Sequence, residues 1–180
     1  MENSVSHWQL AGFVFTAAVG TLLHFMFDLT HENSFVALFS AVNESIWEHM
    51  KLLFWPMFLF ALVEYSAWGK ERTQFWCVKL LGILLGLILI PVLYYTYTGS
   101  LGISADWFNI TIFFISAALV FRVENVLFQR EPVRSFSPAQ ALGGLCLIMI
   151  LFMVLTFFPP HIPLFRDAAT GECGIGKVLR

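Results

Sequence analysis

Long apolar runs fill most of this chain and limit the folds that it can adopt. An α-helix needs about 20 apolar residues to span the roughly 30 Å hydrocarbon core of a bilayer. Only 12% of the residues are charged, whereas soluble domains carry about 25%. We therefore predict an all-α, polytopic membrane helix bundle that forms a single domain over residues 1–180. The five predicted spanning helices cover residues 8–28, 44–68, 75–97, 106–129 and 137–158, and residues 159–180 form a tail.

A further apolar stretch, residues 34–42, is too short to span a bilayer. One continuous helix from Ser34 to Trp68 would be about 52 Å long at about 1.5 Å per residue, which exceeds the thickness of one bilayer. We therefore expect a short re-entrant or interfacial helix over residues 34–42 and a break near Asn43.

Charge and cysteine content narrow the function classes. The net charge is −2, which argues against a nucleic-acid partner and against a polybasic lipid-binding surface. Cys77, Cys146 and Cys173 are widely spaced and form no C-x-x-C pair, which argues against thiol redox chemistry and a thiolate zinc site. The lipid bilayer is the expected partner, and the cell membrane is the expected location.

Lysine and arginine residues in the short loops predict the orientation. Lys70 and Arg72 mark one loop, Arg130 and Arg134 mark another, and helix parity puts both loops on the same side. The loop over residues 98–105 carries none. We therefore expect a cytoplasmic N-terminus and an extracytoplasmic C-terminus, although basic residues in the tail count against this assignment.

The most polar stretch, residues 43–51, directly precedes an apolar run. At helical spacing Glu44 and Glu48 are one turn apart, as are Ser45 and His49, so the four side chains would share one broad helix face. A polar face at the mouth of a membrane helix is costly unless it faces protein, water or an ion. The stretch therefore indicates a site.

Helix parity brings four polar segments to one face of the membrane. They are the end of the first helix, the stretch over residues 43–51, the start of the fourth spanning helix and the segment after the last. This grouping does not depend on the orientation of the protein in the membrane. The polar residues are His24, Asp28 and His31, then Glu44, Ser45, Glu48 and His49, then Asp106 and Asn109, and finally His161 and Asp167.

Imidazoles and carboxylates from this group suit a divalent metal such as Zn²⁺, Mn²⁺ or Fe²⁺. The spacing permits such a site without being diagnostic, because the chain has no H-E-x-x-H motif. The candidate metal ligands are His24, Asp28, Glu48, His49 and His161.

The carboxylates of the same group could instead transfer protons. Glu44 with Glu48, or Asp28 with Glu48, would form a carboxyl pair suited to general acid–base catalysis or to a coupled proton in a transporter. These three are the predicted catalytic residues. The structural alternative is a hydrogen-bonded network in which His24 pairs with a carboxylate and Lys51 balances Glu44 or Glu48.

Residues at the opposite membrane face are expected to snorkel or to pair near the boundary. Two glycines one turn apart, Gly82 and Gly86, form a small-xxx-small match that permits close helix packing. The polar residues at this face are Glu64, Lys79, Arg122, Glu124 and Asn125.

Three motifs together resemble a family of small bacterial membrane proteins of unknown function. They are His24-x-x-x-Asp28, the stretch over residues 43–49, and the ending over residues 159–167 with Thr170-Gly171. The resemblance covers most of the chain. The resemblance implies that these motifs belong together, but it does not imply an activity.

Ser45-x-x-x-His49 with a nearby aspartate is similar to the alkaline ceramidase and adiponectin-receptor superfamily of transmembrane zinc hydrolases. In that superfamily the serine and histidine lie on one helix, an aspartate on another and a His-x-x-x-His pair on a late helix. This chain has five predicted spanning helices instead of seven, only His161 after the last of them, and Asp28 ahead of the Ser–His helix. The similarity suggests a zinc hydrolase and leaves the three-histidine site unsupported.

Three functions remain open at this point. The first is a membrane-embedded hydrolase, with a metal such as zinc as its expected cofactor, that acts on a lipid or an amphiphile. The second is a small transporter or solute-binding membrane subunit that uses the same carboxylates. The third is a non-catalytic membrane scaffold.

Overall fold

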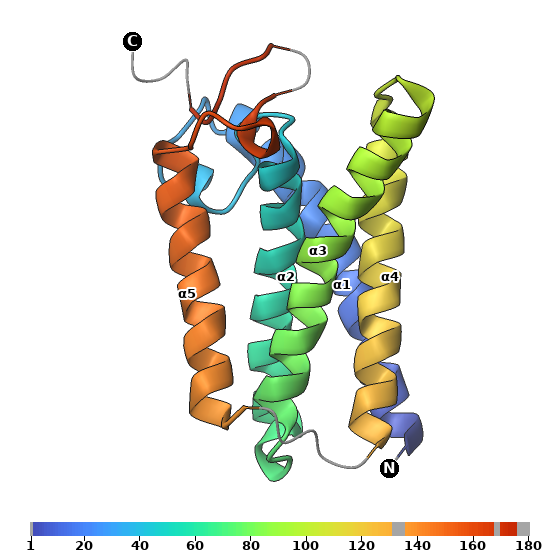
Figure 1. The fold of residues 1–180 in the computed structure, drawn as a ribbon. Helices are drawn as coiled ribbons and strands as arrows, with labels where there is room; N and C mark the ends of the chain where they lie inside the picture. Colours follow the sequence, from blue (N-terminus) through green and yellow to red (C-terminus); the bar gives the residue numbers. More distant parts are fainter. Residues whose placement is uncertain (1, 131–135, 168–169, 176–180) are drawn as a thin grey trace.

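The computed structural model describes residues 2–130, 136–167 and 170–175, and it confirms the all-α fold. Five helices are long and apolar enough to cross a membrane, which indicates a multi-pass membrane protein. They run alongside one another, with the N-terminus at one end of the bundle and the C-terminal segment at the other (Figure 1). The helices are α1 (Glu2–Leu29), α2 (Ile46–Ala67), α3 (Phe75–Leu101), α4 (Asp106–Gln129) and α5 (Pro138–Phe157).

The helix α2 forms the centre of the bundle. Of its most apolar segment 78% is buried inside the protein, compared with 22% for the corresponding segments of α1 and α5. It packs against α1 and α3, while α4 packs against both α1 and α3. The core consists mainly of aliphatic and aromatic side chains from these four helices, and α5, which lies against α3, adds Ala141, Leu145 and Phe152.

The segment between α1 and α2 forms the predicted break, but it is less helical than expected. In place of a helix over residues 34–42 there is one 3₁₀ turn, η1 (Val36–Leu38). Two side chains of α2 bind its carbonyl groups: Lys51 Nζ donates to Ala37 O at 2.8 Å and Trp55 Nε1 to Leu38 O at 3.0 Å. These bonds satisfy backbone groups that a longer helix would have satisfied internally.

The start of α2 also differs from the sequence prediction. The helix begins at Ile46, and Ser45 is its N-cap, whose hydroxyl accepts from the backbone N–H of Glu48 at 3.4 Å. Glu44 and Ser45 therefore precede the helix, and they do not share a helix face with Glu48 and His49. Ser45 and Glu48 match the S-x-x-E pattern of a capping box, which is the signal that could have placed this boundary.

The C-terminal segment folds over this end of the bundle (Figure 1, top). It contains the 3₁₀ turn η3 (Pro163–Phe165) and an isolated bridge between Arg166 and Cys173. Asn43 Nδ2 donates to Gly174 O at 3.1 Å. The tail thus covers the loop that leads into α2.

Candidate metal centre

Three of the polar residues converge where α1, α2 and the loop before α2 meet. His24 Nε2 lies 3.6 Å from Glu44 Oε1, and His49 Nε2 lies 3.6 Å from Glu44 Oε2. The two imidazole ring centroids are 5.7 Å apart. One ligand atom from each of the three residues lies within 4.8 Å of the others, so a single ion could contact all three.

His24 reaches this position because α1 packs closely against α2 at Gly20, one helical turn before His24. A Cβ atom at Gly20 would lie 2.6 Å from the Phe113 ring and 3.1 Å from Leu52 O, a backbone atom of α2. Only a residue without a side chain fits there. The next turn of α1 therefore holds His24 against the first turn of α2.

His49 is oriented by the backbone just before α2. Its Nδ1 lies 2.9 Å from Ser45 O. The carbonyl can only accept, so Nδ1 carries a proton, and Nε2 is the ring nitrogen that faces Glu44. Such a bond to the far ring nitrogen is what orients metal-binding histidines in proteins.

Glu44 is held by contacts of its own loop. Its backbone N–H donates to Asp167 Oδ2 of the tail at 3.1 Å, and the next N–H, of Ser45, donates to Asn43 Oδ1 at 2.9 Å. Its side chain is 53% exposed, compared with 12% for His49. The carboxylate therefore lies on the open side of the cluster, with both oxygens facing the histidines.

This geometry fits the requirements of a zinc-type ion. Ligand distances of about 2.0–2.2 Å in a tetrahedron place neighbouring ligand atoms about 3.3–3.6 Å apart. Each histidine Nε2 lies 3.6 Å from a different oxygen of Glu44, and one ligand atom from each of the three residues lies within 4.8 Å of the others. Two histidines and one glutamate leave a fourth position open, which is the arrangement of catalytic rather than structural zinc sites.

An apolar cavity of about 150 Å³ adjoins the cluster. It lies between α1, α2 and α4, and both histidines form part of its wall. Phe25 and Ile110, which also line it, are more than half exposed on the outer surface of the bundle. The cavity therefore leads from the cluster toward the surface that a bilayer would cover. Its other lining residues are Gly20, Thr21, Leu52, Phe113 and Phe114.

The comparisons with known proteins place the whole chain in one family, because a family model matches residues 1–175. The chain belongs to DUF6512, a family of unknown function. No curated protein and no solved structure matches it. The predicted membership of a family of unknown function is confirmed, and the similarity to transmembrane zinc hydrolases stays a prediction.

In this DUF6512 protein Glu48 lies apart from the cluster, in a buried ion pair. Its Oε2 is 2.5 Å from Lys51 Nζ and accepts from the backbone N–H of Val42 at 3.1 Å. Lys51 also donates to Thr156 of α5 at 3.0 Å. Both charged side chains are almost fully buried. Lys51 therefore balances Glu48, as the structural alternative predicted. The pair connects α2 with α5 and with the loop before α2.

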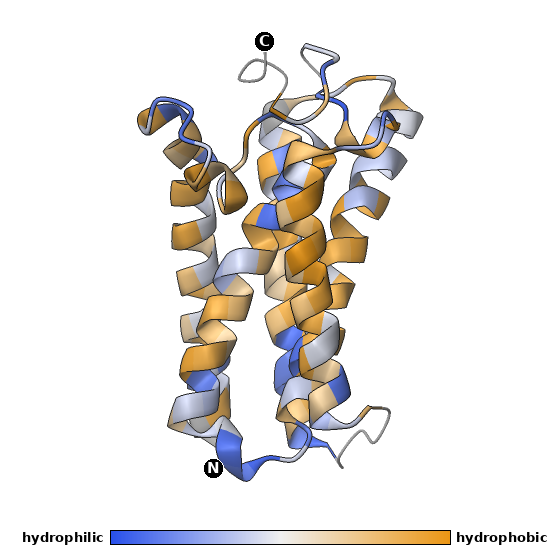
Figure 2. Cartoon of the chain, turned by 90° about the vertical axis from the view of Figure 1, so that its left-hand side faces the viewer, coloured by the Kyte–Doolittle hydropathy of each residue, from blue (hydrophilic) through white to orange (hydrophobic). Residues whose placement is uncertain are grey.

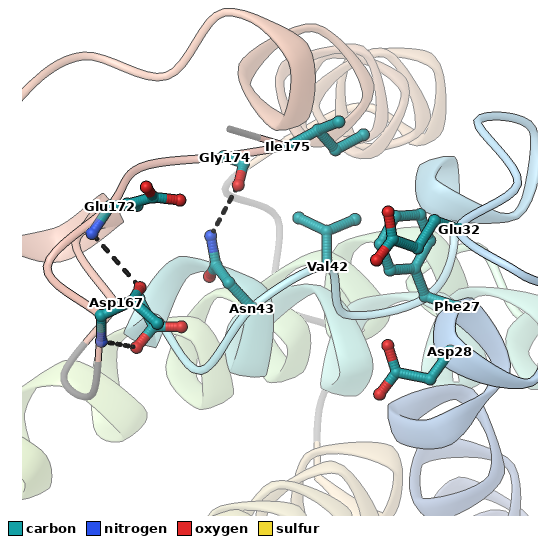
Figure 3. A pocket seen from close by; sticks show the side chains of 10 residues that line it. Phe27, Asp28, Glu32, Val42, Asn43, Asp167, Glu172, Gly174 and Ile175 are labelled. Atoms are coloured by element: carbon teal, nitrogen blue, oxygen red, sulfur yellow. Dashed lines mark hydrogen bonds between the residues drawn. The ribbon is translucent and has the colours of Figure 1, made fainter. Parts of the chain in front are cut away.

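Two other predicted ligands also lie outside the cluster. Asp28 lines a separate pocket of about 120 Å³, together with Glu32, Asp167 and Glu172 (Figure 3). His161 is exposed in the segment after α5. The side chain of Asp106 lies outside the described residues. The structure thus brings together His24 and His49 with Glu44, which the sequence had indicated mainly as an acid–base residue and only secondarily as part of the metal shell.

Ser45 does not form the Ser–His pair that its spacing permits. Its hydroxyl accepts the N-cap hydrogen bond, and the imidazole of His49 contacts the Ser45 carbonyl oxygen instead. A serine hydroxyl needs a base within hydrogen-bond reach to act as a nucleophile. The local geometry therefore gives Ser45 a capping role in the DUF6512 fold.

Proposed function

We propose that this DUF6512 protein is a membrane-embedded, metal-dependent hydrolase that acts on a lipid or another long-chain amphiphile. One observation carries the proposal: His24, Glu44 and His49 meet beside an apolar cavity that leads toward the bilayer-facing surface, and the two histidines form part of its wall. A metal centre at the end of an apolar cavity combines a reactive group with a binding site for a hydrocarbon chain.

The three residues would hold the ion, each with one atom. His24 and His49 would bind through Nε2, and Glu44 through a carboxylate oxygen. A divalent ion of this kind supplies Lewis acidity toward a carbonyl group and activates water for attack. Among the three predicted catalytic carboxylates, Glu44 alone faces this centre, because Glu48 binds Lys51 and Asp28 lines the neighbouring pocket.

The cavity indicates the substrate class. Its wall is formed mainly by aromatic and aliphatic side chains, which favour an acyl or alkyl chain over a charged solute. A chain that enters between α1 and α4 would bring an ester or amide carbonyl to the cluster. Hydrolysis then breaks the bond between the acyl carbon and its oxygen or nitrogen, and water supplies a hydroxyl to the acyl group and a proton to the leaving group.

The test uses purified full-length protein in detergent micelles with added Zn²⁺. We expect zinc-dependent hydrolysis of long-chain p-nitrophenyl esters or p-nitroanilides, at least about tenfold faster than that of short-chain analogues, a preference of about 1.4 kcal/mol. Ile110→Trp, at an exposed position on the cavity rim, should reduce this preference without changing the metal content. A protein that binds zinc but cleaves none of these probes would contradict the hydrolase and favour the solute-binding alternative.

The orientation is part of the same proposal, with the N-terminus in the cytoplasm and the metal centre at the extracytoplasmic face. Lysine and arginine residues in the short loops support this orientation, although one of them, Arg134, lies outside the described residues. In a variant without native cysteines, a membrane-impermeant thiol reagent added outside should label Thr170→Cys and leave Lys70→Cys unlabelled. The reverse pattern would invert the orientation, and labelling of both would contradict the count of five spans.

A further inference from the structure

A second buried polar cluster lies near the other end of the bundle, where hydrophilic segments interrupt the apolar helices (Figure 2). Lys79 of α3 forms ion pairs with Glu64 of α2 and, at 2.6 Å, with Glu124 of α4. Gln9 of α1 donates to Glu64 Oε1 at 2.9 Å. All four are at most 3% exposed. Of the polar residues expected to snorkel here, these glutamates and the lysine pair inside the bundle, and Arg122 is exposed.

The surroundings of this Glu64–Lys79–Glu124 triad are apolar. Three phenylalanine rings have their centroids 5.6–5.7 Å from Lys79 Nζ. Gly82 lets Glu124 lie directly against the α3 backbone, because a Cβ atom at this position would be 2.7 Å from Glu124 Cγ. The rings are those of Phe75, Phe121 and Phe128.

The charges in the triad do not balance. Two carboxylates and one ammonium group give a net charge of −1 if all three ionise. Among the described side chains, α1 contributes only the neutral amide of Gln9, and the nearby Arg72 guanidinium donates to the backbone carbonyl of Phe128 at 2.9 Å. An uncompensated charge is very costly in an apolar interior, and proteins usually remove it by protonation.

We propose that the triad is a proton-binding site, in which the folded protein holds one proton on Glu124. Glu64 is the better anion, since Oε1 accepts from Gln9 and Oε2 faces Lys79. Glu124 Oε2 also faces Lys79, but Oε1 is buried and has no hydrogen-bond partner among the described residues. A proton on this oxygen makes the triad neutral and keeps the ion pair of Lys79 with Glu64.

Buried carboxyl groups of this kind bind and release protons in pumps and transporters. The Glu48–Lys51 pair at the other end of α2 provides an internal comparison, since one carboxylate faces one ammonium group there and no extra proton is required. The ligand of the triad is therefore a proton, and the site is separate from the proposed metal centre.

Infrared spectroscopy of the detergent-solubilised full chain at neutral pH tests this proposal. The wild type should show the carbonyl band of a protonated carboxylic acid, shifted by ¹³C-glutamate labelling. Glu124→Gln should lose the band, and so should Glu64→Gln, because each leaves one carboxylate for one lysine. Glu48→Gln is the matched control and should keep it.

Thermal stability locates the proton on one of the two carboxyl groups. Glu124→Gln replaces a neutral acid with a neutral amide, so its melting temperature should stay within a few degrees of the wild type. Glu64→Gln makes Glu124 the anion that pairs with Lys79, and it should lower the melting temperature further because Oε1 of Glu124 is buried without a hydrogen-bond partner among the described residues. Absence of the band in the wild type, retention of the band in Glu124→Gln, or failure of Glu124→Gln to fold would each overturn the proposal.

Discussion

Replacing His24 or His49 with alanine is expected to abolish zinc binding. Each histidine would supply one of the three proposed ligands, so either replacement would leave two, and the affinity should fall by more than the 10–100-fold that follows loss of an outer-shell partner. The measurement is the zinc content per chain after loading with Zn²⁺ and removal of free metal. We expect about one ion per chain in the wild type and none in the variants.

His161→Ala is the matched control for this experiment, because His161 lies at the same end of the bundle but is exposed and outside the cluster. It should bind zinc like the wild type. Replacing His49 with glutamine, which keeps more of the side-chain volume, separates loss of a ligand from loss of packing in α2. Full zinc content in His24→Ala together with loss in His161→Ala would contradict the assigned ligand set.

Replacing Lys51 with methionine should produce the largest loss of stability. Lys51 is fully buried, and its removal leaves the Glu48 carboxylate buried without a counter-charge. Breaking such a pair costs about 3–5 kcal/mol. For a chain of this size that lowers the melting temperature by about 6–20 °C.

The double variant Glu48→Gln with Lys51→Met provides the comparison. Removing both charges eliminates the unpaired carboxylate, so the double variant should be more stable than Lys51→Met alone. Thermal unfolding in the same detergent, followed by circular dichroism, measures both variants. A Lys51→Met protein as stable as the wild type would mean that the Glu48–Lys51 pair does not stabilise the bundle.

The five helices could be predicted from the sequence because each apolar run alone determines a membrane span. The second spanning helix was predicted to begin at residue 44, whereas α2 begins at Ile46. The prediction was too early because Glu44 and Ser45 also fit helical spacing. The 3₁₀ turn η1 depends on Lys51 and Trp55, which bind its carbonyl groups from a different helix. Contacts of this kind are tertiary, and no local pattern shows them.

The candidate site was only partly predictable for the same reason. Helix parity placed the polar residues at one membrane face, and His24 and His49 do meet there. The choice between Glu44 and Glu48 depended on whether residue 44 is helical, and the N-cap at Ser45 turns Glu44 toward the histidines. That Glu64, Lys79 and Glu124 form one triad could not be predicted, because the pattern of apolar runs does not show which helices are neighbours.

Zinc K-edge X-ray absorption of the loaded wild-type protein tests most directly whether His24, Glu44 and His49 hold a metal. A four-coordinate shell of nitrogen and oxygen at about 2.0–2.1 Å, with outer-shell scattering from two imidazoles, is the predicted result. The His24→Ala/His49→Ala double variant should lose the imidazole signal. An oxygen-only shell in the wild type, or the same imidazole signal in the double variant, would contradict the assigned metal centre.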